Sequence, residues 1–381
     1  MSKPTIAIIG AGPAGLTLAR ILNLQGAPAI VFERESHAGV RSQGGSLDMH
    51  PDAGQFAIHL AGLDAAFARI ARYEDQETRV YDKHGTLRFI EDDVTGKDRP
   101  EVDRGHLRQM LLDSLPSDAI RWGHELKSVE QQDAGPVELA FANGARERLD
   151  LVVGADGAWS RVRPLVSDVR PIYSGVTFVE LGIDDVDTRH PDLARLVGNG
   201  LMFALGDGKA IIGHRDANAH IGVYAALRMP ETGIEGAALR TTAAALFDGW
   251  SDALLQLITR ADDRAGSRPI HALPVGHRWA HRPGVTLIGD AAHLMSPFGG
   301  DGANLAMRDG ADLALAILED DWDGAIARHE TVMFDRAAEA AAGAKSGIND
   351  TFSEDGLAHM LGRMARQLGP GEPSADDRLG P

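Results

Sequence analysis

Residues 5–15 read Thr-Ile-Ala-Ile-Ile-Gly-Ala-Gly-Pro-Ala-Gly, and this stretch decides the fold. An apolar run from Ile6 to Ile9 breaks into Gly10, Gly12 and Gly15, and a second apolar run follows. This order predicts a buried strand, a tight turn and a helix. In such a unit the first glycine permits the turn, the second lets the backbone approach a pyrophosphate, and the third lets helix and strand pack closely.

The next apolar run, Ala29 to Phe32, ends in a carboxylate at Glu33. A carboxylate at that strand end can accept hydrogen bonds from a ribose hydroxyl. The free N–H groups of a helix that opens near Pro13 favour phosphate. The stretch therefore predicts a dinucleotide site. Because Glu33 would repel a 2′-phosphate, we expect FAD or NAD there rather than NADP.

The composition restricts the classes of protein that fit. A chain of 381 residues with 44% hydrophobic content can bury a large core and more than one domain. The formal charge of −17 disfavours nucleic acid and anionic membranes as partners. There is no cysteine, which excludes disulfides and thiolate chemistry. No leader pattern and no apolar run of about 20 residues occur, so we expect a cytoplasmic protein and a monomer.

Two further buried strands end in an acid beside a glycine. Residues 149–153 run into Gly154-Ala155-Asp156-Gly157, and residues 285–288 run into Gly289-Asp290. Past the second, the helix expected from Gly302 directs free N–H groups and a partial positive charge toward whatever lies before it. An isoalloxazine ring carries negative charge once reduced, so this helix end is a suitable electrostatic partner for it. His293 is assigned no chemistry.

The apolar pattern predicts the other elements. Helical spacing covers 51–71, as one or two helices, and 106–115, 237–246, 253–259, 302–318 and 323–343. Strand patterns cover a hairpin over 79–90 and strands at 126–129, 137–141, 149–153, 176–183, 200–204, 209–214 and 220–227. The last four have no predicted helix between them, which favours a mostly antiparallel sheet inserted into the first domain. Residues 269–275 are expected to return the chain to that first domain.

These motifs resemble a known family. Gly10-x-Gly12-x-x-Gly15 with Glu33-Arg34, Asp156-Gly157 within Gly-Ala-Asp-Gly-Ala-Trp-Ser-Arg-Val-Arg, and Gly289-Asp290 within Gly-Asp-Ala-Ala-His look like the three fingerprints of class A FAD-dependent aromatic monooxygenases. The likeness covers residues 5–349. Within the family the chain most resembles the tetracycline-inactivating flavin monooxygenases, through the stretches Phe32-Glu33-Arg34, Gly44-Gly45-Ser46-Leu47-Asp48, Val102-Asp103-Arg104 and Met295-Ser296-Pro297-Phe298.

The resemblance implies a discontinuous α/β fold. It consists of a Rossmann-like FAD-binding domain of the glutathione-reductase type, an inserted and mostly antiparallel substrate domain, and C-terminal helices. The expected boundaries are 1–72, 102–171 and 268–320 for the FAD-binding domain, 73–101 and 172–267 for the substrate domain, 321–368 for the helical segment and 369–381 for a disordered tail. No separate nicotinamide domain is expected.

The resemblance also implies residue roles. Glu33 would hold the adenosine ribose, Arg104 and Asp290 would bind the FAD chain, and Asp156-Gly157 would serve both FAD and a transient NADPH or NADH. The predicted cofactor residues are Gly10, Gly12, Pro13, Ala14, Gly15, Glu33, Arg34, Arg41, Asp48, Arg104, Asp156, Gly157, Asp290, Pro297, Gly299, Gly302, Ala303 and Asn304. The candidate substrate residues are Phe178, Glu180, Met202, Ile212, His214 and Tyr224, lining a cavity between the inserted strands and the flavin. No side chain is predicted to be catalytic and no metal is expected.

Four positions depart from the family pattern. Asp301 stands where such loops commonly carry glutamine. By an approximate alignment, Glu180, Gly200 and Gly222 replace an amide, an arginine and a histidine of the drug-inactivating members. The fold and the cofactor are unaffected by these differences, but tetracycline as the substrate does not follow from the resemblance.

The reaction that the family implies uses NAD(P)H to reduce FAD, which then adds dioxygen as a C4a-hydroperoxide and passes oxygen to an electron-rich carbon. An aromatic or polycyclic phenol is the expected substrate, with tetracycline-like antibiotics among the candidates. A flavin-dependent reductase, dehydrogenase or halogenase without oxygen insertion is the alternative, although the chain has no Trp-x-Trp-x-Ile-Pro stretch. A non-catalytic dinucleotide-binding regulator is a third hypothesis.

Overall fold

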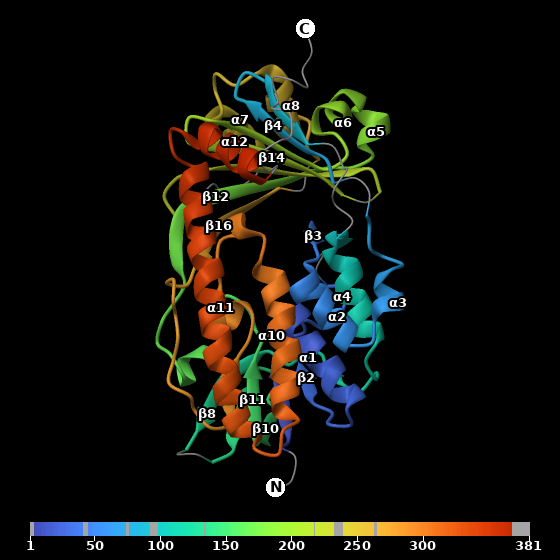
Figure 1. The fold of residues 1–381 in the computed structure, drawn as a ribbon, viewed down its shortest axis with the longest axis vertical. Coiled ribbons are helices and arrows are strands. Elements are labelled where there is room, and N and C mark those ends of the chain that lie inside the picture. The colour runs from blue at the N-terminus through green and yellow to red at the C-terminus, as the bar shows by residue number, and fades with distance from the viewer. Residues whose placement is uncertain are drawn as a thin grey trace. The chain divides into compact units, whose positions relative to one another are not determined.

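The computed structural model describes residues 4–40, 45–73, 76–91, 98–132, 135–216, 218–231, 239–262 and 265–367. The chain forms two compact units, shown as a ribbon in Figure 1. Unit 1 comprises Met1–Ala71, Arg99–Ile172 and His271–Lys345, and unit 2 comprises Arg72–Asp98, Tyr173–Ile270 and Ser346–Pro381. The tail predicted to be disordered, 369–381, lies outside the described residues.

A five-stranded parallel sheet is the centre of unit 1. Its strand order is β17-β11-β1-β2-β7, with bounds Val285–Leu287, Leu151–Gly154, Ile6–Ile9, Ile30–Phe32 and Ile120–Arg121. Alternate residues of β1 point to opposite faces, so Ile6 and Ile8 belong to one core and Ala7 and Ile9 to another. The predicted strand, turn and helix at the start of the chain are confirmed.

Helices cover one face of this sheet. They are α1 (Pro13–Leu24), α4 (Arg104–Asp113) and α10 (Gly302–Ile317), and their apolar residues share the core of Ile6 and Ile8. Figure 1 shows α1 beside α10. Gly310 makes this possible, because a Cβ there would lie 2.6 Å from the carbonyl oxygen of Ala14. The two helices that begin at predicted cofactor motifs are thus packed backbone to backbone.

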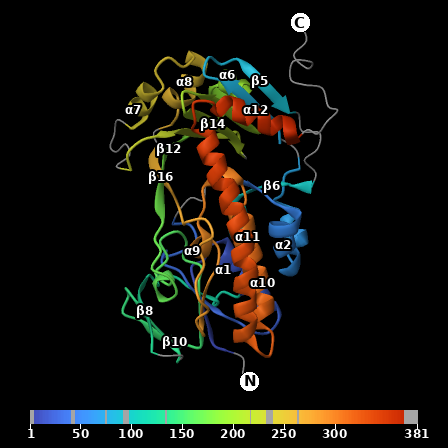
Figure 2. The ribbon, with the colours of Figure 1, turned by 60° about the vertical axis from the view of Figure 1, so that its left-hand side comes forward.

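The other face packs against a three-stranded antiparallel sheet, β8 (Leu126–Gln131), β9 (Val137–Phe141) and β10 (Arg146–Leu149). Figure 2 shows this sheet on the far side of unit 1 from α10. The single strand predicted at 149–153 is two strands. The chain breaks at Asp150, whose carboxylate accepts from the N–H and the hydroxyl of Thr5, both at 2.8 Å, so β11 alone joins the parallel sheet.

Unit 2 contains a seven-stranded sheet of order β16-β12-β15-β14-β13-β4-β5. The bounds are Gly266–Ala272, Ile172–Ile183, His220–Arg228, Lys209–Asp216, Leu201–Gly206, Thr78–Asp82 and Leu87–Glu91. Strands β12 and β15, β15 and β14, β14 and β13, and β4 and β5 pair antiparallel, whereas β13 and β4 pair parallel. The expected mostly antiparallel sheet is confirmed. Residues 269–275 were expected only as a connection, but part of this range is strand β16.

Helices cover one face of the unit 2 sheet. They include α6 (Pro191–Val197), α7 (Leu239–Leu246) and α8 (Asp252–Thr259), which bury one core with alternate residues of β12, β14 and β15. The expectation of no helix between the strands at 176–183 and 200–204 is wrong. Pro191 at the first position of α6 supplies a helix-compatible φ there, and Leu193 and Val197 give it a buried side.

The remaining elements include short strands, short helices and two C-terminal helices. They are β3 (Ser46–Asp48) paired with β6 (Glu101–Asp103), the π-helix η1 (Pro51–Gln55), α2 (Phe56–Leu60), α3 (Asp64–Phe67), η3 (Arg163–Leu165), α5 (Val186–Arg189), α9 (Asp290–His293), η4 (Pro297–Gly299), α11 (Trp322–Thr351) and α12 (Gly356–Gln367). Among the described helices, none has the length and apolar character needed to cross a bilayer.

Candidate functional site

The three predicted motifs lie at one edge of the parallel sheet of unit 1. Strands β1, β11 and β17 are neighbours and run in the same direction, so their carboxyl ends meet. The strand hydrogen bonds continue into the turns: the N–H of Ala155 donates to Ile9 O at 2.8 Å, and the N–H of Ile288 donates to Gly154 O at 2.9 Å. The carboxyl edge of a parallel α/β sheet is where such folds bind ligands.

The glycines of the first turn are of two kinds: Gly10 and Gly15 pack against backbone atoms, whereas Gly12 borders open space. Gly10 has φ of +108°, and a Cβ on it would lie 2.3 Å from the carbonyl oxygen of Ala155. A Cβ on Gly15 would lie 2.3 Å from the carbonyl oxygen of Gly10. Among the described residues beyond its chain neighbours and its own helix, none has an atom within 4 Å of the Cβ position of Gly12, and as N-cap of α1 this glycine provides no side-chain cap. The turn therefore leaves space and backbone donors where a pyrophosphate would bind.

Glu33 is buried beside this turn. One carboxylate oxygen accepts from the N–H of Ala11 at 2.7 Å, and the other accepts from the N–H of Glu35 at 3.0 Å. The side chain is only 8% exposed, so its position is fixed by the protein. Each carboxylate oxygen keeps acceptor capacity for a ribose hydroxyl. Arg34, the next predicted residue, is exposed.

Sequence reasoning missed Arg108, which supports the same turn. Its guanidinium donates to Ala11 O at 3.1 Å and Ala38 O at 2.9 Å, and it pairs with Glu35 at 3.1 Å. The predicted residue Arg104 lies one turn earlier, where α4 begins, and its N–H donates to Gly45 O. The signal for Arg108 was weak, since a charged residue between helical apolar positions usually faces solvent.

The second motif presents an unsatisfied acceptor. One oxygen of Asp156 accepts from the N–H of Arg161 at 2.7 Å, whereas its other oxygen, Oδ1, is buried without a hydrogen-bond partner among the described residues. Burial raises the pKa of this carboxyl. Gly157 follows with φ of +79° and no atom near its Cβ position. A buried acceptor without a donor fits a ligand that brings hydroxyl groups.

A second missed arginine joins this motif to the third one. Arg163, 3% exposed, donates to Ala158 O at 2.8 Å, to Ala291 O at 2.8 Å and to Asp290 O at 3.2 Å. Burial lowers the pKa of its guanidinium, and the nearby carboxylates of Asp156 and Asp290 oppose that effect. A planar side chain with several fixed donors suits this role, because it can fasten two loops at once.

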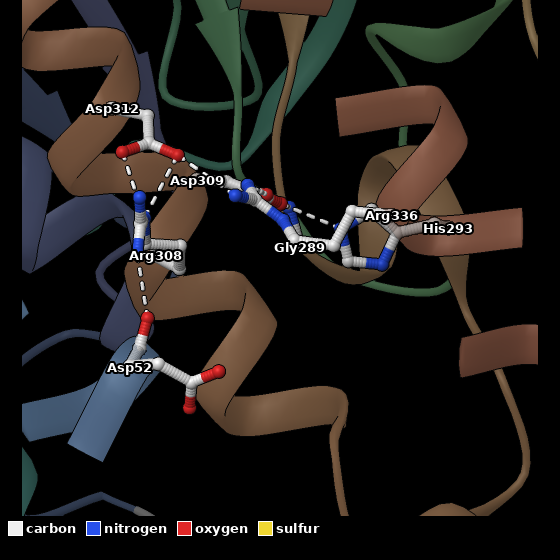
Figure 3. A network of polar contacts seen from close by, with 7 residues as sticks. All are labelled: Asp52, Gly289, His293, Arg308, Asp309, Asp312 and Arg336. Atoms are coloured by element: carbon white, nitrogen blue, oxygen red, sulfur yellow. Dashed lines mark hydrogen bonds and ion pairs between the residues drawn. The ribbon is translucent and has the colours of Figure 1, made fainter. Parts of the chain in front are cut away.

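The third motif combines an exposed acid with a buried support. Asp290 is exposed at the start of α9, and Gly289 before it has φ of +59°. The N–H of Gly289 donates to Asp309 of α10 at 3.0 Å, and Nε2 of His293 lies 2.5 Å from the same oxygen (Figure 3). Burial opposes protonation of His293, but Asp309 outweighs it and raises the pKa of the imidazole.

The start of α10 is tied to residues 48–54. Asn304, 1% exposed, accepts from the N–H groups of His50 at 2.9 Å and Gly54 at 3.2 Å, and it donates to Asp48 O at 2.8 Å. These three bonds engage the side chain of Asn304, so its backbone is the part left to contact the flavin. That contact stays a prediction. Gly302 has open space at its Cβ position, and α10 has no side-chain cap.

Acidic groups and a histidine gather beside this helix end. His50 lies 3.0 Å from an oxygen of Asp48 and 3.7 Å from an oxygen of Asp301. Burial would raise the pKa of Asp48, but the His50 hydrogen bond lowers it below its ordinary value. Burial raises the pKa of Asp301. The predicted residue Arg41 lies outside the described residues.

Five of the six predicted substrate residues share one face of the unit 2 sheet. In the register, Glu180 and Ile212 lie opposite Tyr224, and His214 lies opposite Gly222. Their neighbours along each strand, such as Val179 and Ile211, belong to the helix-covered core. Residues of this predicted set on the face away from that core are Phe178, Glu180, Ile212, His214 and Tyr224.

Met202 is the exception, and its prediction as a cavity residue is wrong. It is fully buried in the helix-covered core, because its position in β13 has the opposite parity to the residues that pair with Ile212 and His214. A one-residue difference along a strand moves a side chain to the other face of the sheet. The prediction took β13 to begin at Gly200, and the sequence alone did not specify its register.

The face of the unit 2 sheet away from the helix-covered core carries aromatic and charged groups in contact. Arg268 pairs with Glu180 at 2.6 Å and lies 5.8 Å from the ring centroid of Phe178, which in turn lies 5.8 Å from the ring of Tyr224. His214 lies 3.1 Å from Asp216. Such a set can hold a flat ring by stacking and its polar substituents by hydrogen bonds.

Comparisons with known proteins agree with this geometry. A family model described as an FAD binding domain matches residues 3–325. The monooxygenase penA of Penicillium thymicola is 32% identical over 95% of this chain and 98% of its own length. The 3-amino-4-hydroxybenzoate 2-monooxygenase PtmB3 of Streptomyces platensis is 31% identical over 89% of this chain and 86% of its own length.

Solved structures share the fold. Klebsiella pneumoniae HpxO, in complex with FAD and uric acid, superposes with a TM-score of 0.80 at 23% identity, covering 95% of this chain and 93% of its own. The tetracycline destructase Tet(55) superposes with a TM-score of 0.74 at 22% identity, covering 96% of this chain and 95% of its own. The likeness to both is one of fold.

Proposed function

This chain belongs to the family defined by the FAD binding domain, among relatives that are flavin-dependent monooxygenases, and from that membership we propose that it hydroxylates an aromatic or polycyclic phenol. FAD is its cofactor and monooxygenation its class of reaction. The observation that carries the proposal is that Glu33, Asp156 and Asp290 follow strands of one parallel sheet at its carboxyl edge. The buried oxygen Oδ1 of Asp156 has no hydrogen-bond partner among the described residues.

The residues at this edge suit FAD by their chemistry. Backbone donors at Gly12 would bind the pyrophosphate, Glu33 the ribose, and Asp156 and Asp290 the hydroxyl groups of the chain between them. The amino end of α10 would face the ring system and favour the negative charge that the ring carries when reduced. Bound FAD supplies the activation of dioxygen and the oxygen atom that is inserted. The protein contributes orientation, electrostatics and the exclusion of water.

The face of the unit 2 sheet away from its helix-covered core supports the proposal of a phenolic substrate. Phe178 and Tyr224 form a ring pair on this face, and Arg268, Glu180 and His214 add charge and hydrogen-bonding groups to it. A hydrogen-bond acceptor beside a phenol hydroxyl increases the electron density of the ring, which favours attack on an electrophilic oxygen. Uric acid, 3-amino-4-hydroxybenzoate and tetracyclines appear in the names of similar proteins, and each is a ring system with polar substituents.

We further propose NADPH or NADH as a transient electron donor and dioxygen as co-substrate. A tetracycline-like antibiotic stays one candidate within the substrate class. A reaction that consumes NAD(P)H is consistent with a cytoplasmic location, and size-exclusion chromatography would test the expected monomer.

The deciding experiment is a substrate panel. Purified protein reconstituted with FAD is given NADPH or NADH and a set of phenols, purines and polyketides that includes tetracyclines. We expect at least one phenol to stimulate NAD(P)H oxidation and to gain the mass of one oxygen atom, with one NAD(P)H consumed for each product. Stimulation by another phenol but not by tetracyclines would reject the tetracycline candidate and leave the class intact.

Two other outcomes would favour the alternative functions. Turnover of a substrate without oxygen would indicate a flavin-dependent reductase or dehydrogenase, and halide incorporation would indicate a halogenase. Protein that stays colourless after incubation with FAD would indicate a regulator that does not use the flavin. The last outcome would also contradict the assignment of the sheet edge as an FAD site.

A further inference from the structure

Asp309 is a buried acid for which the sequence predicted no role. It lies in the middle of α10, is fully buried, and contacts three residues outside that helix. One oxygen accepts from the N–H of Gly289 at 3.0 Å and lies 2.5 Å from Nε2 of His293. The other oxygen accepts from Arg336 of α11 at 2.9 Å (Figure 3). Both oxygens are therefore occupied, and each serves a different part of unit 1.

The charge of Asp309 is balanced inside the protein. Arg336 pairs with Asp309 through one nitrogen and with Asp312, one turn further along α10, through another at 2.9 Å. Asp312 also binds Arg308 at 2.8 Å, and Arg308 donates to Asp52 O at 2.6 Å. A buried carboxylate without such partners would be strongly destabilising. On the side that faces α11, the charge of Asp309 is therefore paired with Arg336, which also pairs with Asp312.

The other side of Asp309 faces the third motif. Gly289 directly precedes Asp290, and its φ of +59° is the conformation that turns the chain from β17 into α9. His293 ends the same short helix. Asp309 therefore holds both ends of the four-residue helix that carries Asp290, while Arg163 holds the backbone oxygens of Asp290 and Ala291. A short helix has little intrinsic stability, so these external bonds set its position.

We propose that Asp309 is a positioning residue for FAD: it fixes the Gly289 turn and His293, and through them it places Asp290 at the cofactor. The proposal rests on the proposed function. Asp312 provides the matched control, because it shares Arg336 and the helix α10 with Asp309 but contacts neither Gly289 nor His293. Asp312 is also less buried, with 20% of its side chain exposed against 1% for Asp309, so the melting temperatures of the variants are needed to separate an effect of charge burial from an effect on FAD.

The test compares FAD binding by apoproteins of Asp309→Asn, Asp309→Ala and Asp312→Asn. FAD is removed, apoprotein is titrated with FAD, and the Kd is read from flavin fluorescence, together with the melting temperature of each apoprotein. We expect Asp309→Ala to raise the Kd about tenfold or more, because it removes hydrogen bonds to a charged acceptor. Asp309→Asn keeps an oxygen for Gly289 but loses the charge, so we expect a rise of about threefold. Asp312→Asn should stay within about twofold of wild type.

A readout specific to cofactor position accompanies the titration. The visible circular dichroism of bound FAD depends on the surroundings of the ring and chain, so it should change in the Asp309 variants and not in Asp312→Asn. Equal Kd values for Asp309→Asn and Asp312→Asn, with identical flavin spectra, would overturn the proposal. If Asp309→Ala does not fold, the comparison of the two asparagine variants decides. Failure of wild-type apoprotein to bind FAD would instead reject the proposed function.

Discussion

The Nε atom of Arg163 donates to the carbonyl oxygen of Ala291 at 2.8 Å, although 128 positions separate the two residues. Through this bond and those to Ala158 and Asp290, one buried side chain joins the turn after β11 to the turn after β17. Hydrogen bonds from Arg163 therefore hold the loops of Asp156 and Asp290 together without any ligand.

Replacing Arg163 by lysine tests that connection. An ammonium group lacks the planar fork that reaches three carbonyl oxygens, so we expect the free energy of unfolding of the apoprotein to fall by about 2 kcal/mol. FAD affinity should fall as well. Urea unfolding of the apoprotein and FAD titration give both quantities. Arg161→Lys is the control, because that side chain is 55% exposed, and it should change neither. An unchanged unfolding curve for Arg163→Lys would contradict the assigned role.

The glycines of the first turn make opposite predictions. In Gly10→Ala, a Cβ would lie 2.3 Å from Ala155 O on a residue with φ of +108°, so we expect a loss of stability of about 3 kcal/mol. In Gly12→Ala, the backbone angles suit alanine and the space is open, so apoprotein stability should change by less than about 0.5 kcal/mol.

FAD binding separates the two glycine variants further. The methyl group of Gly12→Ala would occupy the space left for the pyrophosphate, so FAD affinity should drop while the apoprotein remains stable. Thermal melts and FAD titrations of the two apoproteins measure this. Normal FAD affinity in Gly12→Ala would place the pyrophosphate elsewhere.

Asn304 should act as a structural clamp. In Asn304→Asp the two N–H donors from 48–54 keep an acceptor. A carboxylate oxygen would, however, face the carbonyl oxygen of Asp48, which in the wild type accepts a hydrogen bond from Nδ2 of Asn304. We expect a loss of about 2 kcal/mol in the free energy of unfolding. Asn143→Asp is a matched control, since Asn143 also bonds backbone groups on both sides but lies in an exposed turn. Similar losses in both variants would contradict the clamp.

His281 gives unit 1 a pH-dependent contribution to stability. Burial would lower the pKa of its imidazole, but Glu330 at 2.9 Å and Asp323 at 3.4 Å outweigh burial and raise the pKa above the ordinary value of 6.5. A raised folded-state pKa stabilises the protein fully below the ordinary value, and this contribution is lost as pH rises through the folded-state pKa.

The measurement compares wild type with His281→Gln by urea unfolding at several pH values between about 5.5 and about 9. The difference in free energy of unfolding should be largest at the acidic end and should shrink as pH rises above 6.5. Taking the difference removes the contributions of His277 and His329, whose pKa values burial lowers. A difference that grows with pH would contradict the assigned charge pairing.

Local chemistry explains which parts of the fold were predictable. Glycines and acids after apolar runs identified β1, β11 and β17, because a buried parallel strand is a continuous apolar run and its ligand edge needs small residues. The strand patterns predicted a mostly antiparallel sheet of four strands and a hairpin over 79–90, but not strand β16, which was expected as a connection. The register of β13 was not predicted, so Met202 was assigned to the wrong face, since nothing in a single strand specifies its partner.

The supports of the site were harder to predict than its contacts. Arg108, Arg163 and Asp309 are charged residues on helices or turns, where a sequence pattern predicts exposure. Their burial depends on acceptors and donors up to 128 positions away, such as Ala291 for Arg163. Only the fold brings those partners together, so a single sequence contains the motifs of the site but no sign of what holds them.

Unit 1 is assembled from three separate segments of the chain, and its edge strand β17 is among the last parts to be made. On the ribosome, β1 emerges early but waits for residues 285–287 before the sheet is complete, and Asp309 and Arg336 emerge later still. A nascent chain arrested before that point would leave the edge of β11 without its partner strand, which is a hazard for aggregation. The proposed coenzyme site is therefore complete only after Asp290 and the start of α10 have been synthesised.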